Sequence, residues 1–204
     1  VDNPDTDGYV TYTPNEYTAD VTIHTNLGDK VVKDVAGTYG TPVTINVPTV
    51  AGYTANKETV IATVNADGTI TVDNPDTDGY VTYTPNEYTA DVTIHTNLGD
   101  KIIKGVTGTY GQPVTVDVPS VDGYTADKDT VTATVNADGT IAVDNPNTDG
   151  YVTYTANTYT TDVTIHTNLG DKIVKDVTGA YGQPVTVDVP SVDGYTADKD
   201  TVTA

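Results

Sequence analysis

The chain of 204 residues carries 29 aspartates and glutamates against nine lysines and no arginine, which gives a formal net charge of −20 and a pI near 4.1. Such a charge repels phosphate backbones and anionic membranes, which argues against nucleic acid as a partner and against membrane insertion of this segment. Cysteine is absent, so no disulfide can form, and no apolar run approaches the roughly 18 residues that a membrane-spanning helix needs.

The sequence repeats itself with a period of 71 residues, because the stretch that begins at Val1 begins again at Val72, and a changed copy begins at Val143. Residues 1–71 and 72–142 differ at 13 positions, which indicates recent duplication of one module. We predict that residues 1–16 are the closing strand of a preceding repeat, 17–87 and 88–158 are complete repeats, and 159–204 form a truncated repeat. Linkers of about four residues further predict an elongated rod.

The first half of the unit is predicted to form strands, since Thr, Val, Ile and Tyr alternate with period 2. Residues 17–25 place Val21 and Ile23 on one face, and a turn over 26–29 leads into a second strand over 30–35. A third strand covers residues 43–47, between a loop over 37–42 and a second loop over 48–52. The pattern therefore predicts a hairpin followed by a separate short strand.

The second half is predicted to form another hairpin and a closing strand. Strands over residues 57–64 and 69–72 flank the turn sequence NADG, and the unit closes with a strand over 80–84. Residues 55–58 are the only candidate for a helical turn. We therefore expect an all-β or predominantly β fold.

The positions of several residues resemble the MucBP (mucin-binding protein) repeat. They are Val21-Thr22-Ile23, Gly37, Gly40, Pro48, Gly52-Tyr53 and the terminal Val81-Thr82-Tyr83, and the resemblance covers each whole unit. MucBP and related MUB-type repeats occur in cell-wall-attached surface adhesins of lactobacilli and other Gram-positive bacteria. The resemblance implies tandem β-grasp-like (ubiquitin-like) repeat domains, an extracellular location at the bacterial cell wall, and glycans of host mucin or other glycoproteins as partners.

An acidic loop is the candidate metal site. Alternating oxygen donors precede a glycine, as in calcium loops, although Pro14 stands where an EF-hand carries its bidentate glutamate. The alternative is a turn in which Asp and Asn cap their own backbone. No cofactor is required by the sequence, and calcium is the candidate ion. The candidate ligands are Asn3, Asp5 and Asp7, then Asn74, Asp76 and Asp78, and in the third copy Asp149, where Asn147 replaces one carboxylate.

The histidines, serines and lysines offer no catalytic site. His24, His95 and His166 are the only neutral-pH titrators, and His24 lies about 13 Å along its strand from Asp20, too far to share one ion. No serine stands near a histidine in the sequence, so the chain is predicted not to be an enzyme. The lysines of a unit (Lys30, Lys33 and Lys57) are expected to discourage edge-to-edge pairing of strands rather than to form isopeptide crosslinks.

Tyrosine is the only aromatic residue of the chain, and tyrosine faces stack on sugars and on protein partners. In the closing strand, alternation puts Val10 and Tyr12 on the core face and Tyr9 on the opposite face. Tyr9, Tyr80 and Tyr151 are therefore the candidate ligand-binding residues. The alternative is that they cover a sheet face or a domain junction, and Gly52-Tyr53 is expected to be a packing corner.

Substitutions between the copies test which positions face the core. Val31→Ile, Val32→Ile and Ile45→Val keep apolar volume, so this group should include buried sites. Asp34→Gly, Asn46→Asp and Ala51→Asp change polarity, so these sites should be solvated.

Together with the repeats, the MucBP resemblance implies a repeat segment of a bacterial cell-surface adhesin. The repeats would act as an extended stalk and as weak, multivalent binders of mucin glycans, since tandem copies raise avidity. Two alternatives remain open: a passive structural spacer, and a self-associating biofilm or fibre subunit.

Overall fold

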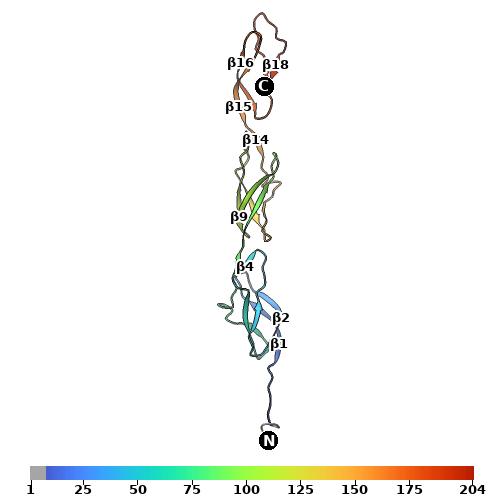
Figure 1. Ribbon diagram of the computed structural model, residues 1–204, viewed down its shortest axis with the longest axis vertical. Helices are drawn as coiled ribbons and strands as arrows, with labels where there is room; N and C mark the ends of the chain where they lie inside the picture. Colours follow the sequence, from blue (N-terminus) through green and yellow to red (C-terminus); the bar gives the residue numbers. More distant parts are fainter. Residues whose placement is uncertain (1–7) are drawn as a thin grey trace. The chain divides into compact units, whose positions relative to one another are not determined.

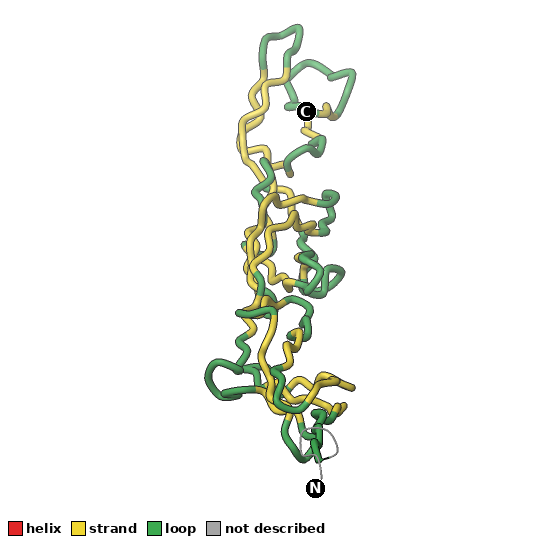
Figure 2. The backbone as a smooth tube through the Cα atoms, turned by 60° about the horizontal axis from the view of Figure 1, so that its bottom comes forward, coloured by secondary structure: helices red, strands yellow, loops and turns green. Residues whose placement is uncertain are grey.

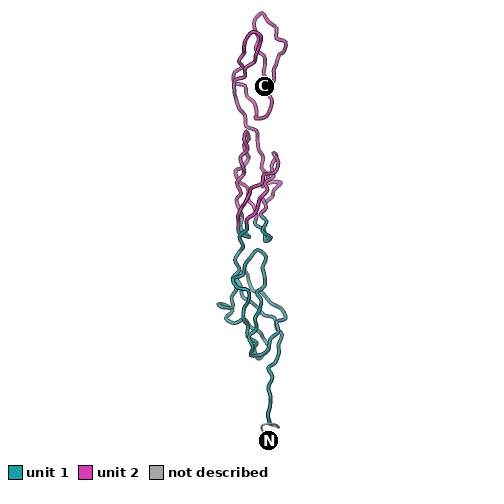
Figure 3. The backbone as a smooth tube through the Cα atoms, in the orientation of Figure 1, with its two compact units in different colours: residues 1–88, 109–112, 135–140 teal, residues 89–108, 113–134, 141–204 magenta. Residues whose placement is uncertain are grey.

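The computed structural model describes residues 8–204 and divides into two compact units (Figure 3). Of the described residues, the first unit comprises 8–88, 109–112 and 135–140, and the second comprises 89–108, 113–134 and 141–204. Residues 8–204 form strands, turns and loops without a helix (Figure 2), so the predicted all-β fold is confirmed. The grasp-like arrangement of the strands stays a prediction.

The first copy contributes seven strands, which pair only antiparallel within three small sheets (Figure 1). One sheet is the β1-β2 hairpin, the second has the order β3-β5-β6, and the third is β4-β7. The strands are β1 (Glu16–Ile23), β2 (Lys30–Thr38), β3 (Val43–Asn46), β4 (Tyr53–Ala55), β5 (Thr59–Val64), β6 (Ile70–Val72) and β7 (Tyr83–Pro85).

The β1-β2 hairpin confirms the predicted turn and alternation. Gly28 takes a positive φ of 83° and its amide donates to the carbonyl of Thr25 at 3.2 Å, so the chain reverses where the sequence places the turn. Val21 and Ile23 are fully buried. The second strand extends three residues beyond the predicted end at Val35, because β1 continues to pair with it up to Thr38.

A bulge interrupts the hairpin between Ala19 and Val21. There the carboxylate of Asp20 accepts hydrogen bonds from Nζ of Lys33 at 2.5 Å and from the amide of Asp34 at 3.2 Å. Asp34 has a φ of 53°, in the left-handed region. The hydrogen bond from Lys33, followed by that from Asp34, lowers the pKa of the Asp20 carboxyl below its ordinary value.

The β3-β5-β6 sheet confirms the predicted NADG hairpin. The amide of Gly68 donates to the carbonyl of Asn65 at 3.1 Å, and the amide of Asn65 donates to the carbonyl of Thr69 at 2.8 Å. In β5, Val60, Ala62 and Val64 face the core while the intervening residues are exposed, as expected for a strand with one buried face.

The closing segment completes the core. Val81 forms an isolated parallel bridge with Thr25, and Tyr83 begins β7, which pairs with β4. The Tyr83 side chain is 2% exposed and its hydroxyl donates to the carbonyl of Pro48. The predicted helical turn over residues 55–58 is wrong, because Ala55 belongs to β4 and the amide of Asn56 donates to the carbonyl of Thr82 at 2.9 Å.

The second copy repeats this arrangement, with sheets β8-β9, β10-β12-β13 and β11-β14. The third copy has the β15-β16 hairpin and the short β17-β18 pair. The strands of the second copy are β8 (Glu87–Ile94), β9 (Lys101–Thr109), β10 (Pro113–Asp117), β11 (Tyr124–Ala126), β12 (Thr130–Val135), β13 (Ile141–Val143) and β14 (Tyr154–Ala156). Those of the third are β15 (Thr158–Ile165), β16 (Lys172–Ala180), β17 (Thr186–Asp188) and β18 (Thr201–Thr203).

The substitutions between copies behave as predicted. Ile45 and Val116 are buried, whereas Val31 and Ile102 are exposed, so the volume-conserving group includes a core site. The sites that change polarity are all exposed, namely Asp34 and Gly105, Asn46 and Asp117, and Ala51 and Asp122. Glycine at position 105 also fits its backbone, which has a φ of 65°.

The prediction of a buried tyrosine is wrong for Tyr12, which precedes the first copy, but right for the complete repeats. Tyr12 is 90% exposed, whereas the corresponding Tyr83 and Tyr154 are buried. The reason is that residues 8–15 form no strand in the structure, whereas Tyr83 and Tyr154 begin β7 and β14 and close the cores of their repeats.

Candidate functional site

The acidic loop before the closing strand is held by its own backbone. Asn74 adopts a left-handed φ of 48°, and its carbonyl accepts the amides of Thr77 at 3.0 Å and Gly79 at 2.8 Å. Asn145 repeats this conformation in the same loop of the second copy. A Cβ at Gly79 would approach the carbonyl oxygen of Asp73 to 2.5 Å, so the loop requires glycine there.

Two of the candidate metal ligands make contacts with different residues, one through its side chain and one through its main chain. Asp76 Oδ1 lies 3.2 Å from His24 Nδ1, and the main chain of Asp78 is engaged by a lysine, since Lys57 Nζ donates to its carbonyl at 2.5 Å. Over residues 8–204 the structure brings together no group of three or more His, Cys, Asp or Glu side chains suited to a metal ion. Asn3, Asp5 and Asp7 lie outside the described residues, and calcium stays a prediction.

Lys128 anchors the same loop in the second copy. Its Nζ donates to the carbonyl oxygens of Asp149 and Tyr151, both at 2.8 Å, and lies 3.8 Å from Asp127 Oδ2. Asp127 Oδ1 in turn accepts the amide of Thr153 at 3.0 Å. The sequence did not predict this role of the lysine. The only sequence feature that indicates it is a lysine that stands 21 residues before the loop aspartate in both copies.

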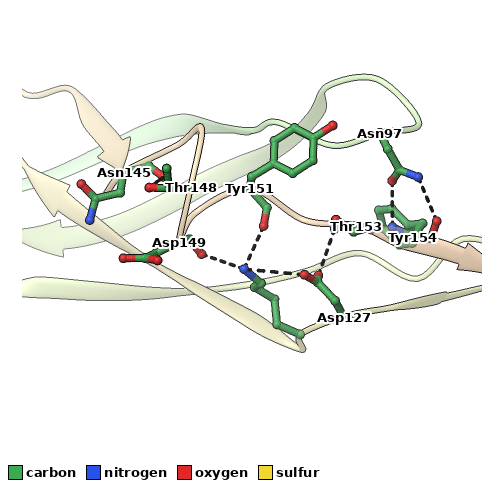
Figure 4. A network of polar contacts seen from close by, with 9 residues as sticks. Asn97, Asp127, Asn145, Thr148, Asp149, Tyr151, Thr153 and Tyr154 are labelled. Carbon is green, nitrogen blue, oxygen red and sulfur yellow. Dashed lines mark hydrogen bonds and ion pairs between the residues drawn. The ribbon is translucent and has the colours of Figure 1, made fainter.

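The ligand candidates Tyr80 and Tyr151 are half-buried, whereas Tyr9 is 74% exposed. The ring of Tyr151 extends away from the contacts of Lys128, which involve only its carbonyl (Figure 4). The lysine therefore fixes the main chain of this tyrosine and leaves its ring partly accessible. Tyr9, Tyr80 and Tyr151 occupy the same position in successive copies of the repeat.

An open surface pocket of about 440 Å³ lies in the second copy and was not predicted from the sequence. Its lining includes acidic, hydroxyl-bearing and tyrosine residues beside apolar ones, and the polar and aromatic residues can hydrogen-bond to or stack on a polar ligand. Among them are Asp117, Ser120, Tyr124, Thr125 and Asp129, and Lys128 also lines the pocket. Lys128 thus contributes to the pocket and also contacts the carbonyl of Tyr151.

The histidines form pairs with aspartates close to the turns. His95 Nδ1 lies 2.7 Å from Asp100 Oδ1, and His166 Nδ1 lies 2.7 Å from Asp171 Oδ1. Asp20, which shares the hairpin with His24, bonds to Lys33 instead. None of the residues that line the pocket beside Ser120 is a histidine.

A tyrosine contact joins two copies within the second compact unit. The rings of Tyr124 and Tyr181 are 5.6 Å apart between centroids, with an interplanar angle of 79°. Asn157 lies between them, since its amide donates to the carbonyl of Gly123 and its carbonyl accepts the amide of Tyr181, both at 2.8 Å. We name Gly123–Tyr124 the glycine-tyrosine corner and Tyr181 the docking tyrosine.

The same contact occurs within the first compact unit. Tyr53 and Tyr110 are 5.3 Å apart at 88°, and Asn86 makes the corresponding hydrogen bonds to Gly52 and Tyr110. Gly52–Tyr53 is therefore a corner that packs, as expected from the sequence, but its partner is a tyrosine that follows β9. Sequence reasoning missed this partner because nothing local marks it.

The comparisons with known proteins identify a family. The MucBP domain model matches residues 88–160 and 162–204, which is more than half of the chain. No curated protein matches the chain. Nothing helical in residues 8–204 has the length and apolar character needed to cross a bilayer. MucBP is an adhesion-type family and not an enzyme family, and its domains occur in extracellular surface adhesins. The chain belongs to the MucBP domain family and is a tandem repeat of the mucin-binding adhesin type.

Proposed function

We propose that the chain is a segment of a bacterial cell-wall adhesin whose repeats act as a stalk and bind mucin glycans weakly at each copy. The observation that carries this proposal is the match of the MucBP domain to two successive copies. Repetition supports it, because linked weak sites gain avidity by effective concentration without new contacts. A net charge of −20 also supports contact with neutral sugars better than with acidic ones.

We place the sugar beside Lys128. The pocket offers carboxylates and hydroxyls to sugar hydroxyls, and Tyr124 offers part of an aromatic face. The partly accessible ring of Tyr151 is the second contact, because Lys128 links its carbonyl to the pocket wall. In the first copy, Tyr80 and Lys57 stand at the corresponding positions.

The test is binding of the 204-residue chain to a glycan array that includes mucin-type glycans. The array compares the wild type with a Tyr80→Ala/Tyr151→Ala variant and with a Ser120→Ala/Asp129→Asn variant. We expect both variants to bind at least about tenfold more weakly, since each loses contacts that the proposal assigns to the sugar. Tyr39→Ala is the control, because Tyr39 is an exposed tyrosine that lies outside the proposed site.

The outcomes separate the hypotheses. Wild-type binding that survives both variants would place the sugar elsewhere on the repeat. Absence of binding to every glycan would contradict the proposed function and favour the passive spacer. Each array is repeated with calcium and with a chelator, and binding that disappears on chelation would support the acidic loop as a calcium site of about 10⁻⁴ to 10⁻³ M affinity.

A further inference from the structure

We propose that the glycine-tyrosine corner is a docking surface for the next copy of the same repeat, and that docking couples the unfolding of adjacent copies. The contact in the second compact unit shows the parts. Tyr181, which follows β16 of the third copy, lies against Gly123 and Tyr124 of the second copy. The interaction is edge-to-face, the favoured geometry for an aromatic pair.

The linker between the copies is part of this surface. Only Asn157 separates β14 from β15, so the closing strand of one copy runs almost directly into the first strand of the next. The main chain of Asn157 bonds to both sides, and its Oδ1 accepts the hydroxyl of Thr125 at 2.6 Å. A linker with these three hydrogen bonds is held in one conformation, unlike a free polar tether.

The tyrosine ring of the next copy leaves no room for a side chain at the corner glycine. Gly123 has a φ of 79°, and a Cβ built there would overlap the ring of Tyr181. Gly52 has a φ of 80° and the same overlap with Tyr110. Gly194 has the same backbone, with a φ of 81°, but no atom of residues 8–204 other than those of its chain neighbours lies within 4 Å of its Cβ position, and Tyr195 is 65% exposed. Close approach of a ring therefore adds a second reason for glycine at residues 52 and 123.

Coupling follows from these contacts. When one copy opens, its neighbour loses the aromatic contact and the hydrogen bonds of the linker, so the opening of one copy favours the opening of the other. Linear repeat proteins show this behaviour, in which stability contains a term for each interface between neighbours. The surface thus serves the array itself; it shares Tyr124 and Thr125 with the lining of the proposed sugar pocket, whereas Tyr151 and Ser120 take no part in it.

Hydrogen exchange of the full chain, measured by mass spectrometry, tests the coupling. Tyr181→Ala should accelerate exchange of residues 121–126, in the preceding copy, by about two- to tenfold, the range expected from loss of one aromatic pair. Tyr181→Phe keeps the ring and should exchange like the wild type. Tyr39→Ala removes the equivalent tyrosine of the first copy and should leave residues 121–126 unchanged. An effect of Tyr181→Ala confined to residues 159–204 would overturn the proposal.

Gly123 and Gly194 give an independent test, in which the second copy is changed and the exchange of the third copy is measured. Gly123→Ala and Gly194→Ala impose the same backbone strain, but only the first displaces a ring. Gly123→Ala should accelerate exchange of residues 178–183, in the following copy, by about two- to tenfold. Gly194→Ala should leave that segment unchanged. Equal exchange of residues 178–183 in the two variants would refute docking as the reason for glycine at the corner.

Discussion

Replacement of two asparagines should destabilise the complete repeats by a magnitude that can be estimated from the contacts. Asn97 Nδ2 donates to the carbonyl of Tyr154 at 2.9 Å, and its Oδ1 accepts the amide of Tyr154 at 2.7 Å. Asn26 makes the same pair of bonds to Tyr83, at 2.9 and 2.8 Å. The side-chain amide therefore substitutes for a neighbouring strand at the point where the closing segment enters the core.

Asn26→Ala together with Asn97→Ala removes two hydrogen bonds from each complete repeat. A hydrogen bond contributes about 0.5–1.5 kcal/mol net, so each repeat should lose about 1–3 kcal/mol. Both asparagines are exposed, so water can reach the vacated positions, and we expect the lower part of that range, about 1–2 kcal/mol. Changing both repeats alike keeps their stabilities comparable, so that a shift in the unfolding transition can be assigned to the asparagines.

The assay is urea unfolding followed by far-ultraviolet circular dichroism. Asn97→Asp keeps an acceptor for the amide of Tyr154 but loses the donor to its carbonyl. The free energy of unfolding of this variant should lie between the values for Asn97→Ala and the wild type. Asn168→Ala is the control, because Asn168 occupies the same turn in the third copy, which has no counterpart of the closing strand within the 204 residues. A double variant that unfolds within about 0.3 kcal/mol of the wild type would show that these bonds contribute nothing measurable.

Three further predictions concern charge and backbone. The hydrogen bond from Lys33 lowers the pKa of Asp20 in the folded state below its ordinary value of 3.8. The bond therefore stabilises the fold fully above that value, and the stabilisation disappears as the pH falls through the lower, folded-state pKa. Replacing Asp20, Asp91 and Asp162 together with Asn should flatten the decline of Tm below about pH 4, and an unchanged slope would contradict the assignment. Asp34→Gly should raise the free energy of unfolding, measured by urea unfolding, by up to about 1 kcal/mol, because the φ of 53° suits glycine. A lower free energy of unfolding would show that Asp34 has another role. Light scattering should detect association as pH falls from 7 to the pI near 4.1, since the charge of −20 disappears. A constant particle size would refute this expectation.

Local patterns predicted much of the strand structure. Alternation in the first strand correctly placed Val21 and Ile23 in the core, and the turn sequence NADG correctly placed the second hairpin. Both features depend on residues a few positions apart, where side-chain direction and turn conformation are fixed by the sequence itself. The same reasoning applied to the closing strand correctly buried Tyr83 and Tyr154.

Features that depend on distant residues were missed or wrong. Residues 55–58 were predicted as a helical turn because the pairing of β4 with β7 joins segments that no local pattern connects. The contacts of Lys128 with the acidic loop and of Tyr181 with Gly123 arise in the same way. The alternation of apolar residues also could not show that Tyr12 is exposed. Alternation indicates which side chains share one face of a strand, but not whether another part of the protein packs against that face.

The contacts between the first turn of a repeat and its closing segment, which include the parallel bridge between Thr25 and Val81, affect how the chain folds during biosynthesis. The bonds of Asn26 to Tyr83 span 57 residues, so the first turn of a repeat finds its partner only when nearly the whole repeat is free. In a chain that emerges from a ribosome or an export channel, the core of each repeat therefore cannot close until its last strand arrives, and such long closures are slow. Because only Asn86 separates β7 from β8, the strand that completes one repeat delivers the first strand of the next. Folding of the array should thus advance copy by copy, in step with its release.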